Sequence, residues 1–333
     1  MERLKIAALL PHVEVFGGVR RYLELGNELA AKGHRFVLFH PQGNKPEWLD
    51  FRAETRPFSA LGEEAFDIGL CGEYSIVPRF DQLSARARFF YFVLEGHKDE
   101  RRIARRKDLH FLGNSEGICR RLEKKFGLRC HRAPGGINPG IFHPSAESSV
   151  RDTFNVLCYG RIIKRRKGVP LVVRAVEKLY RRYPHLRMVF FDTQVGLDRR
   201  DPRPLIKTHV PFEFHLNLPQ ERMSWLYGQA DAFVSAERRA GWSNTSAEAM
   251  ACRVPVVCTP SGTRDFAEDG ITALVAPRPA PFLLARRIER LMVDGFLRAR
   301  LARAGYERIG AFTWTALAER LEIIFASVLV DKS

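Results

Sequence analysis

The sequence has few cysteines, and they are not arranged as a metal or disulfide site. Six are scattered along the chain, at Cys71, Cys119, Cys130, Cys158, Cys252 and Cys258. They include no Cys-x-x-Cys pair and no histidine at ligand spacing, which argues against a structural zinc site and a disulfide framework. We therefore predict reduced, buried thiols. No low-complexity tract and no repeat period is present, which argues against a disordered chain or a repeat protein.

The sequence also lacks a long apolar run. Near the N-terminus, Met1–Val13 holds an apolar stretch of about seven residues that ends at Pro11, far short of the roughly 20 residues that span a bilayer. No convincing cleavage site for a signal peptide follows it. We therefore expect a cytoplasmic protein.

Acidic residues are in deficit. The chain has 54 Lys and Arg against 38 Asp and Glu, which gives a net charge of +16 at pH 7. This excess favours anionic partners, which include nucleic acid, acidic membranes and phosphorylated small molecules. Because the sequence has no recognition motif that interleaves aromatic and basic residues, we expect no specific binding of nucleic acid.

Short apolar runs alternate with helical stretches through the 333 residues, a pattern typical of parallel sheets covered by helices on both faces. In the first half we predict strands at Lys5–Leu10, Arg35–His40, Phe66–Cys71, Arg88–Leu94, His110–Gly113 and Arg129–Ala133, with helices at Val19–Lys32 and Glu116–Phe126. In the second half we predict strands at Asn155–Tyr159, Arg187–Phe191, Phe212–His215, Ala232–Ser235 and Val254–Cys258, with helices at Val169–Tyr183, Gln220–Gly228, Thr245–Ala251 and Pro281–Val293. The polar stretch Pro139–Asp152 predicts a linker, so we expect α/β domains at 1–145 and 152–312, before a terminal helical segment at 313–333.

Two loops that follow predicted strands carry the features of anion sites. Gly17 and Gly18 open the first helix, whose N-terminus attracts anions, and glycine there lets the backbone approach a ligand and adopt positive φ. The alternative is a turn that needs glycine for packing. In the second half, the strand ending at Tyr159 leads into a basic loop in which Arg161 and Lys167 are placed to clamp a diphosphate. Lys164 and Arg165 in the same loop are interpreted as solvated.

A third loop follows the predicted strand Ala232–Ser235. Its turn consists of Gly241, Trp242, Ser243, Asn244 and Thr245. The backbone amides of this turn are expected to bind phosphate or sugar hydroxyls, and Ser243 or Asn244 is expected to cap the next helix. Glu248 is predicted on the first turn of that helix among alanines, which favours a ligand contact over a solvated carboxylate.

The first half contributes a histidine and basic segments. His97 follows a strand at the carboxyl edge of the sheet, where it would orient a substrate hydroxyl or be an incidental surface imidazole. Basic residues at helical spacing come next: Arg101, Arg102, Arg105, Arg106 and Lys107, then Arg120, Arg121, Lys124 and Lys125. They predict basic helix faces that would bind an anionic membrane surface or an anionic acceptor.

Taken in order, these motifs resemble glycosyltransferase family 4, which consists of retaining enzymes of the GT-B fold. The resemblance is carried by the Gly17-Gly18 loop, NSEGICRRL from Asn114, GGINPGIFHP from Gly135, GRIIKRRKG from Gly160, AEAMACRVPVVCT from Ala247 and FTWTALAERLEIIF from Phe312. It implies two Rossmann-like, doubly wound domains facing across a cleft. Residues 1–145 would bind the acceptor and 152–312 the nucleotide-sugar donor, and the helix in 313–333 would cross back to the first domain.

The same resemblance implies roles for individual residues. Arg161 and Lys167 would hold the donor diphosphate, Gly241 to Thr245 would line the donor, and Glu248 would bind the ribose hydroxyls. His97 would lie near the transferred sugar. A nucleotide-diphosphate sugar would be the co-substrate, with no metal and no other cofactor. The acceptor would be a hydroxyl of a glycan or a lipid-linked molecule, in cell-surface polysaccharide or glycolipid synthesis.

The sequence departs from the family pattern at three points. Ala240 stands where the family usually has a glutamate, eight residues before the one that matches Glu248, and Glu237 lies three residues earlier. The loop after Arg161 is one residue longer than usual, so Arg166 is an alternative to Lys167 in the clamp. Arg253 replaces the usual glycine. These departures leave open a second interpretation, a catalytically weak or inactive module that binds a nucleotide or serves as a scaffold.

Overall fold

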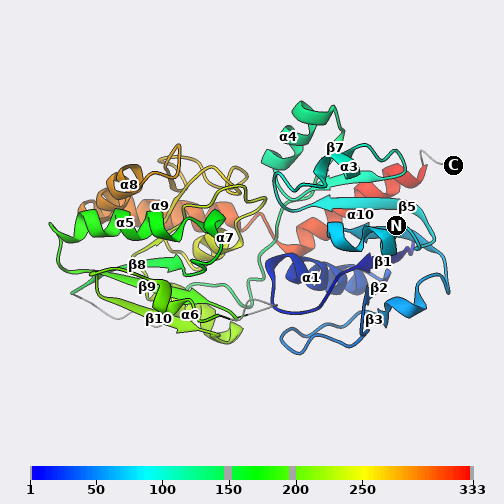
Figure 1. Ribbon diagram of the computed structural model, residues 1–333, viewed down its shortest axis with the longest axis horizontal. Helices are drawn as coiled ribbons and strands as arrows, with labels where there is room; N and C mark the ends of the chain where they lie inside the picture. The colour runs from blue at the N-terminus through cyan, green and yellow to red at the C-terminus, as the bar shows by residue number, and fades with distance from the viewer. Residues whose placement is uncertain (1, 146–151, 195–199, 331–333) are drawn as a thin grey trace. The chain divides into compact units, whose positions relative to one another are not determined.

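The computed structural model describes residues 2–145, 152–194 and 200–330. The chain forms two compact units, one made of Met1–Gly136 with Phe312–Ser333 and the other of Ile137–Ala311 (Figure 1). Each unit is built on a sheet in which every strand pairing is parallel. The predicted α/β class with two Rossmann-like units is therefore confirmed.

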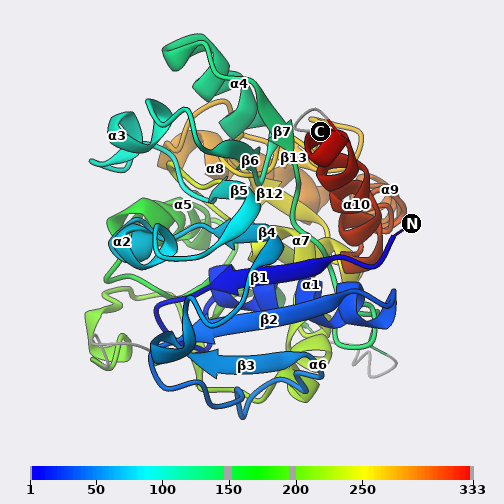
Figure 2. The same ribbon diagram turned by 90° about the vertical axis from the view of Figure 1, so that its right-hand side faces the viewer.

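The sheet of unit 1 has seven strands in the order β3-β2-β1-β4-β5-β6-β7 (Figure 2). They are β1 (Lys5–Leu9), β2 (Arg35–His40), β3 (Glu54–Pro57), β4 (Phe66–Cys71), β5 (Ala85–Phe92), β6 (His110–Gly113) and β7 (Cys130–Arg132). Four of the five residues of the central strand β1 are fully buried, because helices cover both faces of a parallel sheet. Only the edge strand β3 was not predicted, since its sequence ETRP is polar and ends in proline.

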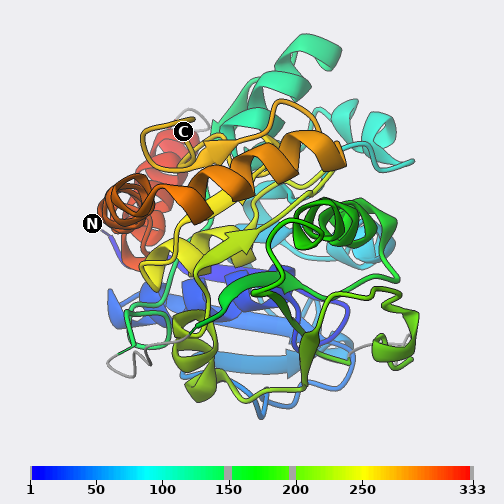
Figure 3. The same ribbon diagram turned by 90° about the vertical axis from the view of Figure 1, so that its left-hand side faces the viewer.

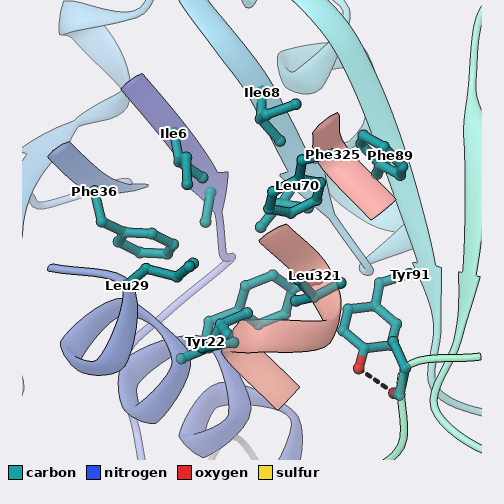
Figure 4. Close-up of a cluster of buried hydrophobic side chains, with 14 of the residues drawn as sticks. Ile6, Tyr22, Leu29, Phe36, Ile68, Leu70, Phe89, Tyr91, Leu321 and Phe325 are labelled. Carbon is teal, nitrogen blue, oxygen red and sulfur yellow. Dashed lines mark hydrogen bonds between the residues drawn. The ribbon is translucent and has the colours of Figure 1, made fainter. Parts of the chain in front are cut away.

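Helices from both ends of the chain cover one face of this sheet. They are α1 (Gly17–Ala31) and α10 (Trp314–Val330). Tyr22 and Leu29 of α1 and Phe325 of α10 pack in one apolar cluster with sheet residues (Figure 4). The other face is covered by α2 (Val77–Phe80), α3 (Glu100–Ala104) and α4 (Glu116–Phe126), with short 3-10 turns at Phe58–Ala60 and Tyr74–Ile76. The segment from Phe312 onward therefore belongs to unit 1.

The division between the units falls after Gly136, earlier than the expected end of the first domain at residue 145. Residues that follow Gly136 bond to α6 (Met223–Gly228) of unit 2. Ser224 Oγ donates to the carbonyl of Ile141 at 2.6 Å and accepts from the backbone N–H of His143 at 3.1 Å. The polar segment Pro139–Asp152 was predicted to be a linker, but its residues Ile141 and His143 are bonded to unit 2.

Unit 2 has six strands in the order β10-β9-β8-β11-β12-β13. Its strands and helices are drawn in green to orange in Figure 3. The strands are β8 (Phe154–Tyr159), β9 (Leu186–Asp192), β10 (Phe212–Leu216), β11 (Ala232–Val234), β12 (Val256–Cys258) and β13 (Leu274–Val275). Its other helices are α5 (Val169–Tyr180), α7 (Asn244–Ala251), α8 (Pro281–Val293) and α9 (Gly295–Ile309), with 3-10 turns at Arg165–Lys167, Arg203–Leu205 and Gln220–Arg222. Because β8 lies between β9 and β11, the strand order reverses at β8, and the loops that follow these three strands lie at one sheet edge.

Four of the six cysteines are buried, as predicted. Cys119 and Cys130 are half-buried, and their sulfur atoms lie 3.3 Å apart. Within the described ranges, no helix is long and apolar enough to cross a membrane. The same residues contain no group of three or more His, Cys, Asp or Glu side chains that could hold a metal ion.

Candidate functional site

Two loops of unit 2 are in direct backbone contact at the carboxyl edge of the sheet. One follows β8 and runs from Gly160 to Gly168, and the other begins after β11. The backbone N–H of Arg238 donates to the carbonyl of Arg166 at 2.7 Å. Gly168 has a φ of +68°, and a Cβ there would lie 2.8 Å from the Cβ of Ala236 and closer still to its carbonyl oxygen. Glycine is therefore required for the two loops to approach each other.

Lys167 and Glu237 form an ion pair between these loops, in which the ammonium group bonds to Oε1 of Glu237. The Lys167 ammonium also lies 5.2 Å from the centre of the Tyr159 ring. Glu237 is 3% exposed, and its carbonyl accepts a hydrogen bond from Thr259 Oγ1 at 2.7 Å. Within the described part of the chain, Oε2 of Glu237 is buried without a hydrogen-bond partner. Such a buried acceptor is costly unless a ligand bonds to it.

Arg161 is held in a second ion pair at the same edge. Its Nη1 lies 3.2 Å from Oδ1 of Asp192 and donates to the carbonyl of Thr193 at 2.8 Å. Burial alone would lower the pKa of Arg161, but Tyr159 and Asp192 raise it above its ordinary value. Burial raises the pKa of Asp192 despite the nearby guanidinium. Asp192 was not predicted as a site residue, although a lone acid at the end of the apolar run RMVFF was a usable signal.

Arg166, the alternative clamp residue, is exposed, and its carbonyl is what joins the two loops. Lys167 is partly shielded and paired. The geometry therefore brings Arg161 and Lys167 into a fixed arrangement, whereas the Arg166 side chain extends toward solvent.

The turn before α7 differs from the prediction in its capping. Ser243 occupies the position before the helix, but its hydroxyl bonds to the hydroxyl of Ser246 at 2.9 Å and does not cap a backbone amide. Asn244 is the first helical residue, so it does not cap the helix either. The amide of Ser243 donates to the carbonyl of Gly262 at 2.8 Å, so it is not available to a ligand.

The other residues of this turn differ in burial. Gly241 and Trp242 are buried, and the Trp242 ring packs 4.8 Å from the ring of Phe266. Asn244 and Thr245 are half-buried at the start of α7. Trp242 therefore belongs to the core of unit 2, and the partly accessible part of the turn is Asn244 with Thr245.

Glu248 lies on the second turn of α7, not the first, because the helix begins at Asn244. It is 9% exposed, and its Oε2 accepts a hydrogen bond from Tyr227 Oη at 2.8 Å. Burial and the neighbouring Glu248 carboxylate raise the pKa of Tyr227 well above its ordinary value. Glu248 is thus not a solvated helix carboxylate.

Aromatic rings connect Glu248 to the ion pairs. The Phe191 ring lies 5.3 Å from the ring of Tyr159 and 5.7 Å from that of Tyr227. Tyr159 contacts Lys167, and Tyr227 holds Glu248. A row of three aromatic rings, Tyr159, Phe191 and Tyr227, therefore connects Lys167 with Glu248.

The glycine loop of unit 1 departs from its predicted conformation. Gly17 is the first residue of α1, and neither it nor Gly18 is among the described residues with positive φ, so that part of the prediction is wrong. A Cβ at Gly18 would meet no atom within 4 Å. Packing inside unit 1 therefore does not require glycine at this position, and the space beside it is open.

His97 is held in place by its neighbours. Its ring stacks on that of Tyr74, with centroids 3.9 Å apart and planes 11° from parallel. Its Nδ1 accepts from the backbone N–H of Asp99 at 3.2 Å. Among the residues with described side chains, the Tyr74 hydroxyl is buried without a hydrogen-bond partner. These contacts fix the orientation of the imidazole, and its role at a substrate hydroxyl stays a prediction.

The predicted basic helix faces are only partly present. The helix α3 ends at Ala104, so Arg105, Arg106 and Lys107 lie beyond it, and the prediction that they extend a helical face is wrong. Arg106 bonds to Asp81 at 2.7 Å and also to Asp108. In α4, Arg121 and Lys125 bond to Glu100, which is 2% exposed. Several of these cations therefore stabilise the unit itself.

Other cations of the same segment face solvent. Arg101, Arg102 and Arg105 are exposed. Binding of an anionic membrane through them, with Arg106, stays a prediction.

The chain is similar in sequence to known glycosyltransferases. Residues 143–308 match the family model described as "Glycosyl transferases group 1". A D-inositol 3-phosphate glycosyltransferase from Frankia alni is 28% identical over 179 residues, which cover 50% of this chain and 44% of that protein. This chain thus spans about half the length of the curated relatives it matches.

Solved structures share the fold over almost the whole chain. A sucrose-phosphate synthase from Thermosynechococcus elongatus superposes with a TM-score of 0.82 at 19% identity, covering 99% of this chain and 100% of that one. Anabaena HepE, solved with UDP and glucose, superposes with a TM-score of 0.76 at 14% identity, covering 98% and 100%. The fold of the two units is GT-B.

Proposed function

Since residues 143–308 belong to the glycosyl transferases group 1 family, we propose that this protein transfers a sugar from a nucleotide-diphosphate donor to a hydroxyl. The observation that carries the proposal is the pair of ion pairs in which a half-buried cation meets a buried carboxylate, Arg161 with Asp192 and Lys167 with Glu237, at the strand edge where such sheets bind ligands. The neighbouring Glu248 is buried on α7. Family likeness and these contacts together support a donor site in unit 2.

In the proposed mechanism, fixed charges stabilise the leaving nucleoside diphosphate. Arg161 and Lys167 donate to its phosphate oxygens, and each is kept in place by its own carboxylate, so little reorganisation is needed as negative charge develops. Amides at the start of α7 add positive potential. These groups, and no metal ion, perform the stabilisation that we propose.

The remaining polar groups are assigned to the sugars. Glu248 accepts hydrogen bonds from the ribose hydroxyls, and His97 orients a hydroxyl at the transferred sugar. Glu237, with Oε2 left unpartnered among the described residues, takes the place of the glutamate that the family pattern would put at Ala240. The acceptor that we propose is a glycan or a lipid-linked molecule, in cytoplasmic steps of cell-surface polysaccharide or glycolipid synthesis.

Thermal-shift titration with UDP, GDP, ADP and dTDP tests the donor site. A ligand that binds only the folded state raises the melting temperature, so one nucleoside diphosphate is expected to do so. UDP is the first candidate, because HepE, a structural neighbour, binds it. The shift is expected to disappear in Arg161→Ala and in Glu248→Ala, and to persist in Arg181→Ala, an exposed position on the same unit. If no nucleotide shifts the wild-type protein, the scaffold interpretation replaces the transferase.

The stereochemistry is a separate prediction. The resemblance to retaining enzymes leads us to expect a new linkage with the anomeric configuration of the donor. In the proposed step the donor phosphate accepts the proton of the attacking hydroxyl, and departure and attack occur on the same face. Proton NMR coupling constants of the first-formed product measure the outcome, and an inverted linkage would refute retention.

A further inference from the structure

The two loops that carry Lys167 and Glu237 also carry a group of exposed cations. These are Lys164, Arg165 and Arg166 before α5, and Arg238 and Arg239 after β11. We call these five residues the loop cation patch. The contact between Arg238 N–H and the Arg166 carbonyl, at 2.7 Å, joins the two parts of the patch. Lys164 and Arg165, interpreted as solvated from the sequence, are therefore members of a larger surface.

The charges of this patch are not compensated within the described residues. None of the five side chains forms an ion pair there, whereas Arg161 and Lys167 of the same loop are each paired with a buried carboxylate. Like charges gathered on adjoining loops repel one another, and a bound anion relieves that repulsion. The patch is thus distinct from the two cations that we assign to the diphosphate.

One cation of the patch lies on strained backbone. Arg239 has a φ of +59°, in the left-handed region that favours glycine. A non-glycine residue in this region is conformationally strained, and Arg253, outside the patch, has the same φ. Here the strained residue presents one of the five cations.

We propose that the loop cation patch binds a carboxylate group carried by one of the two sugar substrates. The inference rests on the proposed function, and it adds that one substrate is anionic beyond the donor diphosphate. Arginines suit this task because the guanidinium group binds carboxylates and phosphates with two parallel hydrogen bonds. Because the patch adjoins Lys167 and Glu237, an anion bound to it would lie beside the donor sugar.

A membrane surface fits the patch less well. Binding at a lipid interface normally adds apolar side chains that enter the bilayer. The large apolar residues that are exposed among the described residues include none from these two loops. The patch is charged without an apolar component, which favours a small anionic group over a lipid surface.

The test uses two matched arginines. Arg239→Gly removes a cation of the patch and suits the positive φ, so the fold is expected to be kept. Arg253→Gly is its control, because Arg253 is also exposed and also has a φ of +59°. Arg253 follows α7 and precedes β12, so it lies at the opposite edge of the parallel sheet. Both variants lose the same charge and gain the same backbone freedom.

Dissociation constants are measured by calorimetry in two arms. The donor arm compares UDP-glucuronate with UDP-glucose, and the acceptor arm compares a hyaluronan tetrasaccharide with maltotetraose. In one arm the wild-type protein is expected to prefer the anionic member. Arg239→Gly is expected to reduce that preference about two- to fivefold, the usual range for an exposed charge pair, and the double variant with Arg165→Ala to reduce it further. Arg253→Gly is expected to leave it unchanged. The arm that responds identifies whether the anion is on the donor sugar or on the acceptor.

Three results would overturn the proposal. One is equal binding of charged and neutral members in both arms. Another is a loss of UDP affinity in Arg239→Gly that is as large as its loss of affinity for the anionic probe, which would make the patch a site for the diphosphate. The third is loss of preference in Arg253→Gly as well, which would reduce the effect to net charge. Failure of the proposed function is recognised separately, because wild-type protein would then bind no nucleotide in the thermal-shift titration, whereas the acceptor arm does not depend on the donor.

Discussion

Lys167→Ala is expected to remove donor binding and to destabilise unit 2. Truncating the lysine leaves the carboxylate of Glu237, which is 3% exposed, as an uncompensated buried charge. Breaking a buried ion pair in this way costs about 3 kcal/mol of unfolding free energy. If the ammonium also stabilises the leaving diphosphate, the turnover rate should fall about 100-fold or more. Urea unfolding and thermal shift with UDP measure the two effects separately.

A double variant distinguishes structure from function at this pair. In Lys167→Met with Glu237→Gln neither side chain is charged, so most of the lost stability should return, since no buried charge is left alone. Donor binding should not return, because the cation is still absent. Lys178→Ala, at an exposed position of α5, is the control and should change neither property. If Lys167→Ala unfolds like wild type, the pair does not bear on stability as we describe.

Gly168→Ala is expected to be the most damaging single change in the loop. The alanine would have to adopt a φ of +68°, and its Cβ would collide with the carbonyl oxygen of Ala236, which is backbone and cannot rotate away. We expect a loss of about 3 kcal/mol or more, from left-handed strain together with the displacement of one loop. Because Lys167 is the preceding residue, donor affinity should fall as well.

Gly270→Ala provides the matched comparison for this change. Gly270 is also in unit 2 and has a φ of +77°, but a Cβ there would meet no atom within 4 Å. Its replacement should therefore cost only the left-handed strain, about 1 kcal/mol. Chemical denaturation followed by tryptophan fluorescence compares the two variants. Equal losses would mean that the loops separate easily and that their contact contributes little.

Much of the architecture was accessible from local sequence patterns. Apolar runs such as KIAAL and NVLCY predict buried parallel strands because a strand covered on both faces needs apolar side chains at every position. The elements that were missed are those whose local signal is weak. Strand β3 is polar, β13 has two residues, and α2 has only four. A pattern shorter than about two helical turns carries too little periodicity to identify a helix.

The candidate site residues were also predicted from short stretches of sequence. Arg161, Lys167 and Glu248 were proposed from the sequence because each lies close to the end of a strand or the start of a helix. The capping of α7 and the φ of Gly17 and Gly18 were not correctly predicted, since a hydroxyl or a glycine has several competing conformations of similar energy. Only the surrounding structure selects among them.

The tertiary structure alone decided which carboxylate holds which cation. Arg161 is paired with Asp192 from 31 residues away, and Lys167 with Glu237 from 70 residues away. Both pairings depend on β8 lying between β9 and β11 in the sheet. Strand order results from how whole layers pack, so it cannot be predicted from the sequence pattern of any one strand. Arg161, Lys167 and Glu248 could therefore be proposed from the sequence, whereas Asp192, the pairing of the charges and their burial were decided by the packing of the sheet.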